Sequence, residues 1–313
     1  MRISIFVFLL AIGIAANSYS QPRDNSSTVN AVRITTPLRV DGQLDEPLYR
    51  EITPLSDFTQ VEPAAGAPAT ERTELWLAYD ADNVYVTFRV WDDRMDRLVA
   101  TEMRRDNGNI WTGNDVVVFV FDTFHDRRSS ISFTVNAIGG RADGQVINER
   151  QYNADWNPVW ELKTGRFDGG WTMEAAIPFK SIRYASGAAQ VWGVNAMRVK
   201  RLTNEISTLA RVPPSQGAQG VEQPAFMATL TGIVAPPQRA SIDLKPYATS
   251  NLRSDMTTLP RVRNDGSAAA GFDAKVSITQ NLTADVTYST DFAQVEADQQ
   301  QRSEEHTSEL QSH

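Results

Sequence analysis

The strongest constraint on this chain is a two-residue alternation of apolar and polar side chains between residues 31 and 232. Such a period is typical of β-strands with one buried face. Residues 74–79 and 84–90 both alternate in this way. Residues 80–83 (DADN) separate them and favour a turn, since Asp and Asn side chains bond to their own backbone. The two runs predict a β-hairpin.

Further runs extend the same pattern along the chain. Residues 115–122 contain an almost continuous apolar run, which is typical of a strand buried on both faces. Residues 131–136, 171–177 and 191–199 alternate again, and helical periodicity of useful length is absent. About eight to ten strands in roughly 200 residues predict an all-β chain built on a β-sandwich, which we place at residues 30–232.

A second part of the chain begins after a break. Residues 233–241 contain Pro236-Pro237 and predict a linker. Two alternating runs then occur within residues 242–301, at 272–278 and 282–288. A two-stranded ribbon is not stable alone, so it either joins the sandwich or opens a larger sheet.

The N-terminus has the layout of an export signal. Arg2 precedes the apolar run at residues 3–16, and small residues follow at 18 and 20. This arrangement predicts a signal peptide over residues 1–20, because the apolar run is shorter than the ~20 residues that cross a bilayer. We therefore expect an exported protein.

The last twelve residues, 302–313, resemble a translated sequencing adapter. We expect them to lie outside the fold and the natural chain to continue beyond Gln301. His306 and His313 then drop out of any functional argument, which leaves His125 as the one remaining histidine.

Composition argues against several classes of function. The chain has no cysteine, which excludes thiolate zinc sites, disulfides and a cysteine nucleophile. A net charge of −8 with scattered basic residues argues against a nucleic-acid partner. Nucleophile-elbow, Walker and dinucleotide motifs are missing. Paired carboxylates are a weak signal in any acidic domain, so we expect no catalysis within these residues.

Several phrases resemble a known family. Residues 40–47 (VDGQLDEP) and the hairpin at 75–86, followed by Asp92-Asp93, are similar to family 9 carbohydrate-binding modules. A narrower group of bacterial outer-membrane proteins places such a module ahead of an uncharacterised barrel-like domain. Phrases that resemble this group lie at residues 104–106, 121–128, 133–136, 170–180, 192–195 and 290–298.

The resemblance implies a jelly-roll-like sandwich followed, at residues 242–301, by the first strands of a truncated outer-membrane β-barrel. It also implies an outer-membrane location, with the sandwich either in the periplasm or at the cell surface.

The resemblance also implies a sugar held between tryptophans, with Arg, amide and carboxylate groups on its hydroxyls. Aromatic faces suit the C–H patches of a pyranose. Trp171 and Trp192 occupy inward strand positions and predict core, whereas Trp76 lies on a polar hairpin face and is either exposed or covered. The candidate ligand contacts are Trp91, Trp111, Trp156, Trp160, Arg104, Arg105, Asp106 and Asn136. The alternatives are loop tryptophans that plug the sandwich end and arginines that form surface ion pairs.

Structural calcium is the cofactor that the resemblance implies. Calcium takes six to eight oxygen ligands, and Asp92, Asp93, Asp115 and Asp122 are the candidates. The alternative is that these carboxylates serve turns and caps.

Three functions remain open from the sequence. The leading hypothesis is a non-catalytic, polysaccharide-binding module displayed by an outer-membrane protein. The second is a structural or protein-interaction sandwich that caps the barrel without binding glycan. The third is an accessory domain of a polysaccharide-degrading system.

Overall fold

A computed structural model describes residues 27–149, 151–237, 242–255, 262–279 and 282–288. The predicted signal peptide at 1–20 and the adapter-like residues 302–313 lie outside these ranges. Within them, none of the helices combines the length and the apolar character that a membrane span requires.

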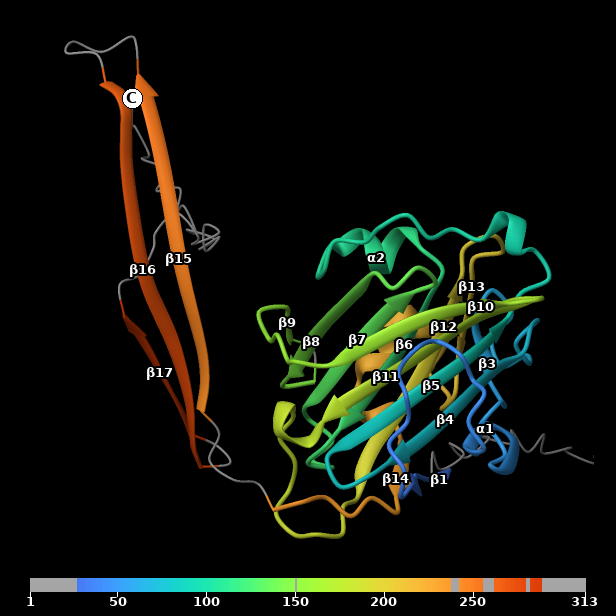
Figure 1. The fold of residues 1–313 in the computed structure, drawn as a ribbon. Coiled ribbons are helices and arrows are strands. Elements are labelled where there is room, and N and C mark those ends of the chain that lie inside the picture. Colours follow the sequence, from blue (N-terminus) through green and yellow to red (C-terminus); the bar gives the residue numbers. More distant parts are fainter. Residues whose placement is uncertain (1–26, 150, 238–241, 256–261, 280–281, 289–313) are drawn as a thin grey trace, which may run out of the picture.

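The larger sheet of the sandwich has nine strands among the described residues, in the order β1-β14-β12-β6-β7-β8-β9, with β13 on β12 and β3 on β13 (Figure 1). Its strands are β1 (Thr28–Asn30), β3 (Thr59–Glu62), β6 (Val116–Asp122), β7 (Ser130–Asn136), β8 (Arg141–Ile147), β9 (Gln151–Asn153), β12 (Trp192–Lys200), β13 (Glu205–Thr208) and β14 (Ala228–Thr231).

The smaller sheet has the order β10-β11-β5-β4-β2. Its strands are β2 (Val32–Arg33), β4 (Thr73–Tyr79), β5 (Asn83–Trp91), β10 (Glu161–Phe167) and β11 (Gly170–Pro178). The predicted hairpin is confirmed, because β4 and β5 pair antiparallel. Asp80 closes its turn by accepting from the backbone N–H groups of Asp82 and Asn83, at 2.8 and 2.7 Å.

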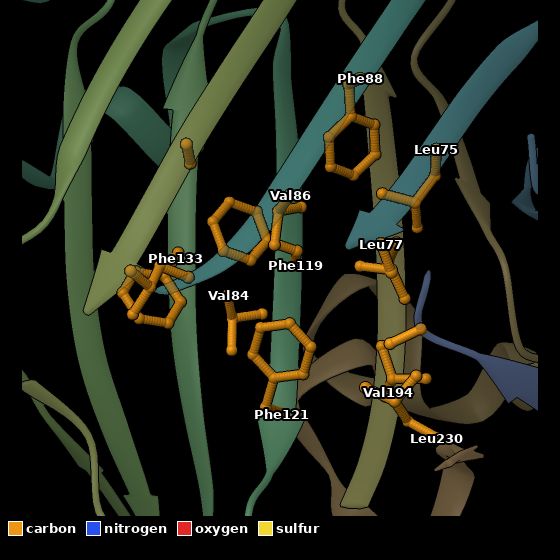
Figure 2. Packing of buried hydrophobic residues seen from close by; sticks show 14 of the residues in the cluster. Leu75, Leu77, Val84, Val86, Phe88, Phe119, Phe121, Phe133, Val194 and Leu230 are labelled. Carbon is orange, nitrogen blue, oxygen red and sulfur yellow. The ribbon is translucent and has the colours of Figure 1, made fainter. Parts of the chain in front are cut away.

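The main core lies between the two sheets. Figure 2 shows Val86 and Phe88 of β5 directed towards Phe119 of β6, and the Phe119 and Phe133 rings stack with centroids 4.9 Å apart. Trp171 and Trp192 are fully buried, so the core prediction for both is confirmed. The fold is the predicted all-β sandwich.

The strand β6 is buried on both faces, as its continuous apolar run predicted. Its odd-numbered residues face the main core, and Val116, Val118 and Val120 face a second apolar cluster. Val221 and Val212 belong to that cluster, in the segment that covers the outer face of the larger sheet. This segment includes the 3-10 helices η3 (Pro214–Glu222) and η4 (Pro224–Phe226).

The N-terminal segment covers part of the outer face of the smaller sheet. Tyr49 of helix α1 (Leu48–Glu51) packs edge-on against Trp76, 5.4 Å between ring centroids. Trp76 is therefore covered, and its indole N–H donates to the Ile52 carbonyl at 2.9 Å. Glu174 of β11 fixes the segment, because it accepts from Tyr49 Oη at 2.6 Å and from the Gly42 N–H at 2.7 Å.

The remaining short helices connect strands. They are η1 (Met95–Arg97), α2 (Gly108–Gly113) and η2 (Phe179–Ser181). Residues 233–235, which we predicted as part of the linker, still belong to the sandwich: Ile233 is buried and accepts from the Gln190 N–H at 2.9 Å.

A third sheet follows the sandwich. It is antiparallel, in the order β15-β16-β17, and Figure 1 shows it standing apart from the two-layered domain. Its strands are β15 (Ile242–Asp255), β16 (Val262–Thr279) and β17 (Leu282–Tyr288). The predicted runs at 272–278 and 282–288 are confirmed as strands.

Candidate functional site

Trp111 lies in the short helix α2, not in the loop that its polar neighbours predicted. Asn107 caps this helix by accepting from the Asn109 N–H at 2.9 Å. The Trp111 side chain is half-buried and packs against the second apolar cluster. It therefore lies on the outer face of the larger sheet.

Three of the sequence-predicted contacts, Arg105, Asp106 and Trp160, surround one buried carboxylate, Asp143 on β8. Arg105 Nη2 bonds both Asp143 oxygens, at 3.0 and 2.7 Å, and Trp160 Nε1 donates to Oδ2 at 3.1 Å. Asp106 accepts from the Asp143 N–H at 3.1 Å. The Arg141 guanidinium lies 5.2 Å above the Trp160 ring. We call these five residues the Asp143 cluster.

Asp143 and Trp160 are the buried members of the Asp143 cluster, whereas Arg105 and Arg141 are half-buried and Asp106 is exposed. Trp160 is only 4% exposed, so its ring presents no free face to a sugar. Burial raises the pKa of Asp143, and the hydrogen bond from Trp160 and the charge of Arg105 oppose that rise. The Asp143 carboxylate is thus paired and hydrogen-bonded by its neighbours, as buried charged groups usually are.

Asn136 and Arg104 also serve the scaffold. Asn136 is fully buried; its amide donates to the Glu102 carbonyl at 2.6 Å and its oxygen accepts from the Gly140 N–H at 2.8 Å. Arg104 is exposed and pairs with Glu102 at 2.7 Å. Trp156 is half-buried, with its ring edge-on to Phe133 at 5.7 Å.

Trp91 stands apart from the other candidates, on the outer face of the smaller sheet. It is half-buried and meets the Phe167 ring edge-on, 4.9 Å between centroids. The two rings line a cavity of about 400 Å³, within the usual range for small-molecule sites. We call it the Trp91 groove, and its lining residues are Gly42, Gln43, Leu44, Arg89, Trp91, Arg166, Phe167 and Thr172.

Local sequence explains the shape of the groove. The VDGQLDEP phrase forms one wall, since Thr172 Oγ1 donates to the Gly42 carbonyl at 2.6 Å. Gly165 allows this close approach, because a Cβ there would overlap the Gly42 backbone. Gly170 likewise leaves room for the Phe167 ring. The groove thus depends on contacts between residues more than 100 positions apart.

Sequence reasoning found Trp91 but missed its neighbours. Arg89, Arg166 and Phe167 carried no motif, although Asp168-Gly169-Gly170 after Phe167 is a turn signal that places Phe167 at a strand end. The pairing of Phe167 with Gly170, beside Trp91, follows only from the order β10-β11-β5.

The predicted calcium ligands do not fit that ion. Asp92 and Asp93 lie with Glu71, but the Lys200 ammonium bonds Glu71 and lies 3.3 Å from Asp92 and 3.2 Å from Asp93. Arg198 adds contacts to Glu71 at 3.0 Å and Asp92 at 3.4 Å. Both basic side chains are only 6% exposed. We call these five residues the Lys200 cluster; its two basic side chains already supply the positive charge that a metal would bring to these oxygens.

Asp115 and Asp122 are separated from each other by the length of β6. Asp115 accepts from the N–H groups of Val99 and Arg201, at 2.5 and 2.8 Å. Asp122 accepts from the N–H groups of Asp126 and Arg127, at 3.2 and 2.9 Å. These carboxylates cap loops, which is the alternative that the sequence left open.

Comparison with known proteins gives both a family and a fold. The model of the family described as "Carbohydrate family 9 binding domain-like" matches residues 40–208, more than half of the 313 residues. No curated protein matches the chain.

Similar solved structures include a family 9 carbohydrate-binding module from Caldicellulosiruptor kristjanssonii, in complex with glucose and with cellotriose. With glucose the identity is 13%, the TM-score 0.47, and the coverage 68% of this chain and 97% of that one. With cellotriose the identity is 14%, the TM-score 0.46, and the coverage 68% of this chain and 95% of that one. A candidate carbohydrate-binding protein from Bacteroides uniformis has 14% identity, a TM-score of 0.50, and coverage of 66% and 98%.

The Bacteroides structure supports the sandwich fold, and the family match spans the strands that build both the Asp143 cluster and the Trp91 groove. This chain belongs to the carbohydrate family 9 binding domain-like family.

Proposed function

We propose that this protein is a non-catalytic carbohydrate-binding module whose sugar contact is the Trp91 groove. The observation that carries the proposal is the half-buried Trp91–Phe167 pair, which lines a cavity of about 400 Å³. The C–H face of a pyranose packs on such a surface, and the groove adds arginine and amide donors for its hydroxyls.

Family membership supports the same function. The matched region includes every lining residue of the groove, from Gly42 to Thr172. Trp160 and Asn136 enter the proposal as positioning residues, because both are buried and bonded within the fold.

Affinity electrophoresis of the full chain in gels that contain neutral or acidic polysaccharides tests the proposal. We expect retardation in at least one gel and a loss of at least about tenfold in affinity, about 1.4 kcal/mol, in Trp91→Ala. Tyr152→Ala is the matched control: Tyr152 is 48% exposed on β9 of the other sheet.

The outcomes separate the hypotheses. If Tyr152→Ala or Trp111→Ala abolishes binding while Trp91→Ala keeps it, the site lies on the outer face of the larger sheet. If no polysaccharide retards the protein, the structural or protein-interaction alternative replaces sugar binding. Release of reducing ends by the purified chain would contradict the non-catalytic assignment.

We further propose that the protein displays this module at the outer membrane. Residues Leu244, Ala274 and Val286 align across β15, β16 and β17, and Pro246, Phe272 and Tyr288 form the next row on the same face. Leu244, Phe272, Val286 and Tyr288 are exposed. An apolar face on strands of 14 and 18 residues suits a lipid-facing surface, which needs about 9–11 residues per strand.

Fractionation of cells that express the complete gene tests the location. Recovery in the outer-membrane fraction supports the proposal, and protease digestion of intact cells then reports which side carries the sandwich. Recovery in the soluble periplasmic fraction would contradict membrane display but leave sugar binding intact.

A further inference from the structure

The Trp91 groove is lined by two arginines in an acidic protein. Its lining includes Arg89 and Arg166 and no carboxylate, whereas the whole chain has a net charge of −8. The overall negative charge of the chain does not explain why two guanidinium groups lie beside the aromatic rings of this groove. They point to a ligand that carries negative charge.

Arg89 is held in a fixed position at the base of the groove. Its Nη1 lies 3.3 Å from Glu74 Oε2, and its guanidinium lies 5.2 Å from the Trp76 ring centroid. Glu74 is buried and is shared with Arg72 at 2.5 Å, so one carboxylate serves two arginines. Trp91 Nε1 also lies 3.4 Å from Glu74 Oε2.

Arg166 is the more accessible arginine. It is exposed on β10, the edge strand of the smaller sheet, and within the described residues it has no ion pair or hydrogen-bonded side chain. Arginine binds carboxylates with two parallel hydrogen bonds when nothing else occupies its donors. Arg166 is therefore free to receive an anionic group that enters the groove.

We infer that the groove binds an acidic sugar, a uronate residue of a polysaccharide. This inference rests on the proposed function and adds its substrate class. A pyranose uronate presents its carboxylate at the ring edge, so the C–H face packs on Trp91 while the carboxylate meets Arg166. The cavity of about 400 Å³ accommodates a ligand of sugar size.

Calorimetric titration of the full chain tests the substrate class. The ligands are oligogalacturonate, the same oligosaccharide after chemical reduction of its carboxyl groups, and a sulfated oligosaccharide of equal length. We expect oligogalacturonate to bind about tenfold more tightly than its reduced form. Its affinity also weakens in about 0.3 M NaCl, where the screening length falls to ~6 Å.

Arg166→Gln is the decisive variant. We expect it to weaken oligogalacturonate binding about fivefold or more and to leave the reduced oligosaccharide unchanged. Arg33→Gln is the matched control: Arg33 is exposed on β2, at the opposite edge of the same sheet, and loses the same charge.

Each contrary result has a distinct meaning. Equal affinity for the native and reduced oligosaccharides, or loss of uronate binding in Arg33→Gln as in Arg166→Gln, overturns the acidic-sugar inference and leaves the module a sugar binder. Tighter binding of the sulfated oligosaccharide also overturns the uronate assignment. Absence of binding to all three ligands and to neutral polysaccharides overturns the inference together with the proposed function.

Discussion

The Asp143 cluster and the Trp91 groove use the same residue types for opposite purposes. In the cluster, Trp160 and Arg105 converge on a buried carboxylate, and the Trp160 ring is buried in the fold. In the groove, Trp91 is half-buried and Arg166 has no carboxylate partner among the residues described.

The difference lies in where the counter-charge comes from. In the cluster, Asp143 supplies the carboxylate that pairs with Arg105 and accepts from the Trp160 indole. The groove has donors and an aromatic face but no internal acceptor for Arg166. A tryptophan near an arginine is therefore a poor guide to function unless the position of the nearest carboxylate is known.

The largest expected effect is on stability, and it tests the buried part of the Asp143 cluster. Trp160→Ala removes a buried indole and the donor to Asp143, so we expect a loss of unfolding free energy near the upper end of about 3–5 kcal/mol. Trp91→Ala should cost less than half as much, because only part of its area is buried. Urea denaturation of both variants gives the two values, and equal losses would break the comparison.

Lys200→Gln extends the comparison to the second internally neutralised cluster. Removing the buried ammonium leaves the carboxylates of Glu71 and Asp92 short of positive charge, and we expect a loss of about 3 kcal/mol. Calcium should restore part of that loss in Lys200→Gln, while calcium and chelators leave the unchanged protein at the same melting temperature. A chelator-sensitive melting temperature in the unchanged protein would contradict the assignment of Lys200 as the resident cation.

Glu222 offers a carboxylate with no cation among the described residues. It accepts from Ser132 Oγ at 2.8 Å, and burial raises its pKa above the ordinary value of 4.5. Because the folded-state pKa is raised, the protonated form of Glu222 is favoured in the folded protein and the ionised form is disfavoured. Its favourable contribution to the free energy of unfolding is therefore present below pH 4.5 and is lost as the pH rises through the folded-state pKa.

Glu222→Gln should therefore raise the melting temperature at pH 7 and have little effect at pH 4. Melting curves followed by circular dichroism across this range check the sign. A variant that is less stable than the unchanged protein at pH 7 would show that an interaction of the ionised Glu222 outweighs its burial.

The smallest expected effect is on the stability of Arg166→Gln. Because Arg166 is exposed and has no ion pair within the described part of the chain, the change in unfolding free energy should stay within about 0.5 kcal/mol. Arg105→Gln is the contrasting variant, since it leaves Asp143 buried and unpaired. Similar denaturation midpoints for the two variants would show that the arginines do not differ as we describe.

Much of the fold could be predicted from the sequence. Alternation located the β4–β5 hairpin, and the continuous run at 116–121 predicted a strand buried on both faces. Short edge strands such as β2 and β9 were not predicted, because two or three residues carry no measurable period. Helix α2 was not predicted either, since its six residues are too few to show helical periodicity.

The site was less predictable than the fold. The polar neighbours of Trp111 and Trp160 suggested exposed loops, yet Trp160 is sealed and Trp111 lies against an apolar cluster. The ion pairs of the calcium candidates were not predictable either: Lys200 stands more than 100 positions after Asp92 and Asp93, so no local pattern shows that it pairs with them.

The sequence alone determined the longer strands, the start of a second part after the sandwich and the family, because these depend on local period, turn chemistry and short motifs. Tertiary structure decided which charged side chains form ion pairs and which aromatic side chains remain accessible. Pairing of β10, β11 and β5 brings Arg166, Phe167 and Trp91 to one groove, while β8 and its neighbours enclose Trp160 and Asp143. Burial and charge compensation are sums over residues distant in sequence, and for that reason they appear only once the sheets have formed.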